Sequence, residues 1–209
     1  MKRFEIITEA DARILELGET VVLITRGHVT PLAVDTLRER RVTVLREDQV
    51  DRDQDQLPPK ADIRRVAVGS DHTGVALKSA LVTALRKRGL AVDDLGTNGT
   101  EPVDYPDTAA AVAKSVARGE ADAGIVIDGA GIGSAIAANK VKGVRAAVCH
   151  DQTTARYARA HNGANVLSLG STIVSVEEAL AIVETWLGTS MQEPRYIRRL
   201  AKIRALEEG

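Results

Sequence analysis

The segment 124–140 constrains this chain more than any other. It begins with an apolar, β-branched run at 125–127, which predicts a buried strand, and it ends with the alanine-rich run 135–138, which predicts a helix. The loop between them carries Gly129, Gly131 and Gly133. A strand, a glycine-rich turn and a helix N-terminus together form an anion-binding site, because the first N–H groups of a helix have no partner inside it. Asp128 ends the strand, so the segment predicts base chemistry on an anionic substrate.

From residue 64 onward, predicted strands and helices alternate. The strands are predicted at 66–70, 91–96, 123–128, 144–149 and 165–169, and the helices at 74–88, 107–118, 134–141, 153–161, 175–187 and 193–207. This alternation predicts an α/β fold with a five-stranded, parallel, doubly wound (Rossmann-like) sheet and right-handed crossovers. Ligands of such sheets bind outside the carboxyl ends of the strands, so side chains that follow a strand are the candidates for function.

The first part of the chain predicts a small α/β appendage. Short strands are expected at 4–7, 20–25 and 42–45. Gly27 is expected to end the second strand, and Thr8 and Thr30 are expected to cap the two helices. A polar, acidic stretch with a proline pair predicts a solvated linker. The domains are therefore predicted as an accessory domain at 1–49, a linker at 50–62 and the main domain at 63–209.

Composition excludes several function classes. The 209 residues carry a net charge of −1, and aromatic residues make up 2%, so neither a basic nucleic-acid surface nor a base-stacking platform is expected. No apolar run approaches the ~20 residues that span a bilayer, and the N-terminus lacks the apolar core of a secretory signal. The single cysteine, Cys149, ends an apolar run and is expected in the core. A cytoplasmic protein without nucleic-acid or membrane partners is predicted.

Three residue pairs outside the glycine loop carry side chains suited to chemistry. Asp71 and His72 follow the first strand of the main domain and precede a helix start, where function is expected. His161 and Asn162 end a helix, where a C-cap and a functional role are both open. Arg195 and Arg199 lie four residues apart, so they share one face of the last helix and either hold a phosphate or face solvent.

Together these positions form a pattern that resembles the ribose-5-phosphate isomerase B family, which includes the galactose-6-phosphate isomerase subunits. The resemblance rests on ordered motifs at 70–78, 104–106, 129–133, 136–140, 161–162 and 165–167. It covers about residues 64–207, so it includes most of the chain and leaves out the appendage. The ordered spacing of the motifs indicates the fold and superfamily more strongly than the substrate.

The resemblance implies an aldose–ketose isomerase that acts on a sugar phosphate through a cis-enediolate, without metal or cofactor. The implied roles are sugar hydroxyl binding by Asp71 and Asn162, pocket lining by Tyr105, ring opening by His161, phosphate binding by His72, Arg195 and Arg199, and enediolate stabilisation by the amides from Gly129 to Gly133. The family's sites lie between two subunits, so a homodimer or a dimer of dimers is also implied.

Departures from the family pattern bear on the chemistry. Asp128 stands where many members have a cysteine base, and Ser134 stands where others have a glutamate base. Asp128 is therefore the candidate base, and Ser134 is a candidate substrate contact. Ala130 replaces a Thr or Ser of the oxyanion region, and Thr172 replaces an arginine. A sugar phosphate other than ribose 5-phosphate is an open alternative.

Two alternatives come from other function classes. The G-x-G-x-G pattern, with Asp151 about twenty residues on, resembles a dinucleotide site, but its spacing is not G-x-G-x-x-G and it follows the third strand of the domain. A non-catalytic sugar-phosphate sensor or scaffold is the second alternative, because both usual bases are missing. Residues 29–40 faintly look like N-terminal segments of proteins encoded with bacterial microcompartments, so the appendage is a candidate docking or oligomerisation domain.

Overall fold

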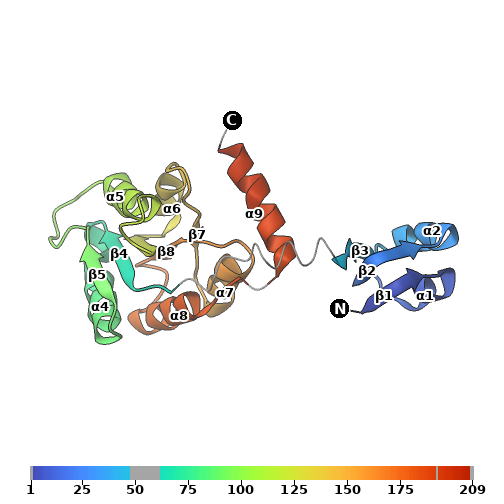
Figure 1. The fold of residues 1–209 in the computed structure, drawn as a ribbon. Helices are drawn as coiled ribbons and strands as arrows, with labels where there is room; N and C mark the ends of the chain where they lie inside the picture. The colour runs from blue at the N-terminus through green and yellow to red at the C-terminus, as the bar shows by residue number, and fades with distance from the viewer. Residues whose placement is uncertain (1, 48–61, 192, 208–209) are drawn as a thin grey trace. The chain divides into compact units, whose positions relative to one another are not determined.

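The computed structural model describes residues 2–47, 62–191 and 193–207 (Figure 1). The chain forms two compact units, one of Met1–Leu57 with Glu193–Ile197 and one of Pro58–Gln192 with Arg198–Gly209. Most of the predicted linker at 50–62 lies outside the described residues. Among the described helices, none combines the length and the hydropathy of a membrane span.

The first unit contains a three-stranded parallel sheet of order β1-β2-β3 with two connecting helices. Its elements are β1 (Arg3–Ile7), α1 (Glu9–Ile14), β2 (Thr20–Val29), α2 (Pro31–Glu39) and β3 (Thr43–Arg46). Its core is made of Ile7, Ala12, Leu15, Val21, Leu23, Ala33 and Leu37, which come from both strands and helices. These elements form the small α/β unit that the sequence predicts.

Gly27 does not end the second strand, and that expectation was wrong. β2 continues through Gly27 to Val29. A Cβ at position 27 would lie 2.6 Å from the carbonyl oxygen of Glu5, so the glycine permits a close approach of the neighbouring strand. The pairing of β1 with β2 shifts register between Phe4 and Ile6 at the same place. The glycine therefore marks a bulge inside the strand.

The second unit contains a five-stranded parallel sheet of order β5-β4-β6-β8-β7. Its strands are β4 (Arg65–Ser70), β5 (Ala91–Asp94), β6 (Ala123–Asp128), β7 (Ala146–Val148) and β8 (Val166–Gly170). Its helices are the short η1 (His72–Gly74), α4 (Val75–Lys87), α5 (Tyr105–Ala117), α6 (Ile132–Ala138), α7 (Gln152–Ala160) and α8 (Val176–Gly188). The last helix, α9 (Pro194–Leu206), has its first four residues in the first unit and the rest in the second. The predicted five-stranded, doubly wound α/β fold is confirmed.

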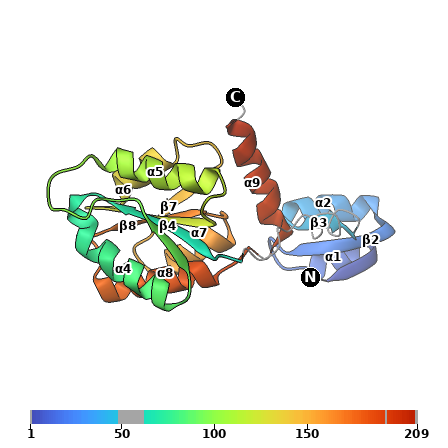
Figure 2. The ribbon, with the colours of Figure 1, turned by 60° about the vertical axis from the view of Figure 1, so that its left-hand side comes forward.

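Helices cover both faces of this sheet (Figure 2). One face packs against α4, α7 and α8 around Leu81, Ile125 and Trp186, and the other packs against α5 and α6 around Val112 and Val126. The central strand β6 is buried along its whole length. Because β4 lies between β5 and β6, the order of the strands reverses there, and ligands of doubly wound sheets bind at such a switch point.

Candidate active site

Asp71 follows β4 and forms the start of the next helix. Its Oδ1 accepts hydrogen bonds from the amides of Thr73 (2.9 Å) and Gly74 (3.3 Å) and from the Thr73 hydroxyl (2.6 Å). The side chain is only 6% exposed. All three bonds use one oxygen, and no donor within the described ranges reaches the other one. Asp71 therefore keeps an acceptor for the hydroxyl of a ligand.

Asp128 ends β6 and caps the glycine loop that follows. Its Oδ1 accepts hydrogen bonds from the amides of Ala130 (2.9 Å) and Gly131, and its Oδ2 accepts one from the amide of Ser134 (2.7 Å). The side chain is 5% exposed. Some of the amides that the resemblance assigns to the enediolate are thus bonded to this carboxylate. Oδ2 keeps one lone pair, because a carboxylate oxygen can accept two hydrogen bonds.

Other donors of the loop remain available to a ligand. The N–H groups of Ile132 and Gly133 lie in the first turn of α6, where a helix offers no acceptor, and they find none elsewhere in the described chain. The hydroxyl of Ser134 is buried, also without a hydrogen-bond partner among these residues. This end of the loop can therefore present donors to a developing oxyanion.

Strand β8 and the turn after it support the glycine loop. Gly131 has a φ of 79°, and a Cβ there would lie 2.9 Å from the carbonyl carbon of Leu169, so only glycine fits. Ser168 donates from its hydroxyl to the carbonyl of Gly131. Thr172 donates to the carbonyl of Gly129 from its amide (3.0 Å) and its hydroxyl (2.6 Å). The sequence analysis did not single out Ser168, and it interpreted Thr172 as the position of a lost arginine. Both residues are far from the glycine loop in sequence, so the fold alone brings their hydroxyls to it.

Tyr105 lies against the same loop. It begins α5, two residues before the predicted start, with Pro106 in the first turn, where a missing N–H costs nothing. A Cβ on Gly133 would lie 2.6 Å from the Tyr105 ring, so the ring rests directly on the glycine backbone. Tyr105 is 40% exposed. The structure therefore brings a partly open tyrosine to the unpaired amides of α6.

His72 follows Asp71 in the turn before α4. Its Nδ1 accepts a hydrogen bond from the amide of Val103 at 3.3 Å. A neutral imidazole that accepts at Nδ1 carries its proton on Nε2, so His72 offers a donor at Nε2. Its orientation is thus set by the segment that precedes Tyr105.

His161 and Asn162 lie at the opposite edge of the sheet. They follow α7, and a crossover helix runs antiparallel to the strands, so its C-terminal end lies near their amino ends. A hydrogen bond agrees with this placement: Nε of Arg145 donates to the carbonyl of Gly163 at 2.9 Å. Arg145 directly precedes β7, so it lies at the amino end of that strand. The His161 ring stacks on Tyr157 with centroids 4.6 Å apart. A single chain therefore does not bring His161 and Asn162 to the glycine loop.

Arg195 and Arg199 both lie on α9. Nε of Arg195 pairs with Glu193 at 2.6 Å, and its guanidinium donates to the Tyr196 hydroxyl at 2.9 Å. Arg195 belongs to the first compact unit and Arg199 to the second, and both are exposed. Their role as phosphate ligands stays a prediction.

Known proteins resemble this chain from about residue 66 onward, and the similarity extends over nearly the whole length of those proteins. Residues 66–203 match the Ribose/Galactose Isomerase family. Ribose-5-phosphate isomerase B of Escherichia coli strain K12 is 44% identical over 146 residues, which are 70% of this chain and 98% of that protein. A Clostridium thermocellum ribose-5-phosphate isomerase B structure is 49% identical with a TM-score of 0.68, covering 69% of this chain and 97% of its own. The structure of Mycoplasma genitalium ribose-5-phosphate isomerase B with bound ribulose-5-phosphate is 41% identical with a TM-score of 0.66. The match covers 69% of this chain and 96% of that one.

These similarities confirm the resemblance drawn from the motifs, and with it the prediction of an enzyme of the sugar-phosphate isomerase class. The match begins at residue 66, so the three-stranded sheet of the first unit and its two helices lie outside it. It includes every predicted site residue, from Asp71 to Arg199. The chain belongs to the ribose/galactose isomerase family.

Proposed function

We propose that this chain interconverts an aldose phosphate and a ketose phosphate, with ribose 5-phosphate and ribulose 5-phosphate as the first pair to test. The observation that carries the proposal is the loop from Asp128 to Ser134, where a buried carboxylate lies beside unpaired amides at the switch point of the sheet. The relatives named ribose-5-phosphate isomerase B support the substrate class. Because Ala130 and Thr172 depart from the family pattern, a sugar phosphate of another chain length is the alternative substrate.

Asp128 is the proposed base. Its Oδ2 takes the proton from C2 of the open-chain aldose and returns it to C1, while the hydroxyl proton moves from O2 to O1, so the composition of the sugar does not change. The amides of Ile132 and Gly133 stabilise the cis-enediolate. Asp71 and Tyr105 contact sugar hydroxyls. The phosphate lies against Nε2 of His72, and Arg195 and Arg199 are its further proposed ligands.

A second copy of the chain completes the site. His161 and Asn162 lie at the amino edge of their own sheet, so in a homodimer or a dimer of dimers His161 of the partner subunit assists ring opening and Asn162 of the partner subunit holds a hydroxyl. Mixing the His161→Ala and Asp71→Asn variants tests this arrangement. Each alone should be nearly inactive. An equimolar mixture should regain about a quarter of the activity, because about half of its dimers are heterodimers and one of the two sites in each heterodimer is intact. No recovery in proven heterodimers would contradict a shared site.

Turnover of four-, five- and six-carbon aldose and ketose phosphates by the purified chain tests the function itself. In D₂O, conversion should place solvent deuterium on the carbon that receives the proton, because the protonated base exchanges with water. Binding of sugar phosphates without turnover of any of them would support the sensor or scaffold alternative, which the family does not favour. A cytoplasmic location, and a microcompartment or other protein partner for the first unit, stay predictions.

A further inference from the structure

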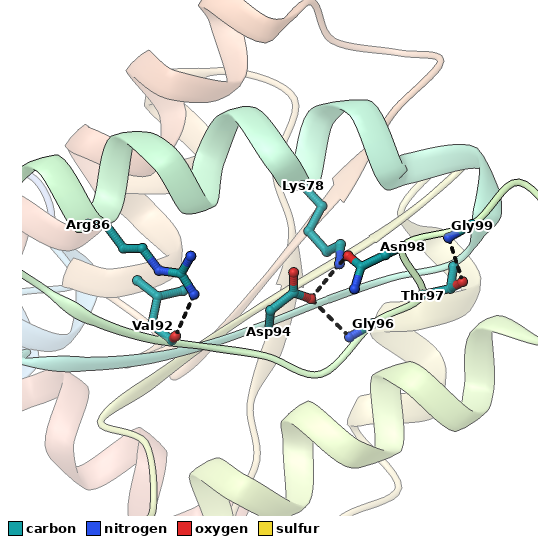
Figure 3. Close-up of polar contacts among 8 residues, drawn as sticks. All are labelled: Lys78, Arg86, Val92, Asp94, Gly96, Thr97, Asn98 and Gly99. Atoms are coloured by element: carbon teal, nitrogen blue, oxygen red, sulfur yellow. Dashed lines mark hydrogen bonds and ion pairs between the residues drawn. The ribbon is translucent and has the colours of Figure 1, made fainter.

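Lys78 is a buried charge that the proposed chemistry does not use (Figure 3). It lies on α4 and is 1% exposed. Its Nζ pairs with Oδ1 of Asp94, at the end of β5, and donates to Oδ1 of Asn98 at 2.7 Å. A buried ammonium is costly unless it is paired, so both bonds contribute to keeping it there. They link α4 to the segment that follows β5.

That segment, residues 95–104, connects β5 with α5. At its start the amide of Gly96 donates to the same oxygen of Asp94 at 3.3 Å (Figure 3). A Cβ on Gly96 would lie 2.3 Å from the amide nitrogen of Ser70. The backbone of the segment is therefore in close contact with the end of β4, just before Asp71. Residues 98–102 are exposed, so apolar packing does little to order the middle of the segment.

The far end of the segment reaches two residues of the candidate site. The amide of Val103 donates to Nδ1 of His72 at 3.3 Å. Tyr105, two residues later, begins α5 and rests on Gly133. A shift of the segment would therefore turn the imidazole and move the phenol ring together.

We propose that Lys78 is a positioning residue of the site: its buried ammonium fixes the segment 95–104, and that segment fixes His72 and Tyr105. A lysine suits the position, because its ammonium offers three donors from one compact charge and can bond acceptors on the strand and on the segment beyond it. An apolar side chain of similar length fills the same space without holding the segment. The proposal rests on the proposed function for its kinetic test, and it also has a test that needs no turnover.

Lys78→Met, which keeps the length and removes the charge, is the main variant. Its kcat/KM on the preferred sugar phosphate should fall about 10–100-fold, the loss expected when substrate-contacting groups are displaced by about 1 Å. Arg86→Met is the matched control: Arg86 lies on the same helix, but its guanidinium donates to the carbonyl of Val92 inside β5 at 3.3 Å (Figure 3). It should leave kcat/KM unchanged.

Amide hydrogen exchange of the substrate-free protein provides the second test. In Lys78→Met the amides of Gly96 and Val103 should exchange at least about tenfold faster, while those of β6 keep their protection. Asn98→Ala leaves the ammonium paired with Asp94, so it should fold in any case and show a smaller increase of the same kind.

Three results would overturn the proposal: unchanged exchange in both variants, faster exchange with unchanged kinetics in Lys78→Met, or an equal kinetic loss in Arg86→Met. If the unmodified chain converts no sugar phosphate, the proposed function fails. Exchange at Val103 then still decides whether Lys78 orders the segment.

Discussion

Replacing Asp128 with Asn separates a catalytic base from a group that only caps the loop. In the native chain the carboxylate accepts the amides of Ala130 and Gly131 at one oxygen and the amide of Ser134 at the other. The Asn carbonyl can keep the first two bonds. Its NH₂ group then faces the N–H of Ser134, so a donor meets a donor in a buried place.

The magnitude follows from these three bonds. An unsatisfied buried amide costs about 1–3 kcal/mol, and a bond to a charged acceptor exceeds one to a neutral acceptor by about 0.5–1 kcal/mol. With one amide unsatisfied and two bonds weakened, Asp128→Asn should lower the free energy of unfolding by about 2–5 kcal/mol. If Asp128 is the base, kcat should also fall by about 10²–10⁴-fold.

Asp128→Cys distinguishes the two roles. A thiol loses all three amide bonds, so this variant should be at least as unstable as Asp128→Asn, yet its thiolate can abstract a proton. A base at 128 thus predicts more activity in the Cys variant than in the Asn variant, although stability follows the opposite order. Urea unfolding measures the stability of each variant, and steady-state kinetics measure its kcat. The intact mass of Asp128→Asn must also be checked, because an Asn that precedes Gly129 can deamidate to Asp. A kcat of Asp128→Asn within about threefold of the native value would refute the assignment.

Three further predictions concern other parts of the fold. Gly133→Ala places a methyl group 2.6 Å from the Tyr105 ring and should lower kcat/KM about 10–100-fold, whereas Gly188→Ala meets nothing within 4 Å and should be neutral. Asp122→Asn should cost about 1–2 kcal/mol at neutral pH. The Arg65 hydrogen bond holds the pKa of Asp122 below 3.8, so this stability is present above that value and lost as pH falls through the folded pKa. The urea midpoints of the two proteins should therefore converge in acid. Burial raises the pKa of the Cys149 thiol to about 11, so a disulfide reagent should label it slowly in the folded chain and quickly in urea; rapid labelling of the folded chain would contradict this.

The sheet of the second unit could be predicted because its signals are local. The apolar run at 123–128 is the strand Ala123–Asp128, and Thr8 caps the first helix as expected, in a capping box with Asp11. Gly27 misled the prediction because its role depends on Glu5, which approaches it from another strand. Sequence spacing alone cannot distinguish a glycine that ends a strand from one that makes room for a neighbouring backbone.

The sequence predicts where the candidate site lies on the sheet, but it does not predict which hydrogen bonds its side chains form. Asp71 and Asp128 follow strands, and that placement alone brings them to one edge of a parallel sheet. Which donors each carboxylate meets depends on its rotamer and on the loop, so the cap formed by Asp128 was not foreseen. Lys78 was missed because its partners, Asp94 and Asn98, are brought to it only by the fold. The remoteness of His161 could have been inferred, because the C-terminal end of a crossover helix lies at the amino edge of the sheet.

The bonds that hold the glycine loop also bear on how its specificity can evolve. Asp128, Ser168 and Thr172 all hold the loop through its backbone. The side chains of Ala130 and Ile132 take no part in those bonds, and Ile132 is mostly exposed. Substitutions at these two positions can therefore alter what meets a bound sugar at little cost to the fold. Variation among relatives that handle different sugars should concentrate there, and libraries randomised at both positions should yield folded proteins at high frequency.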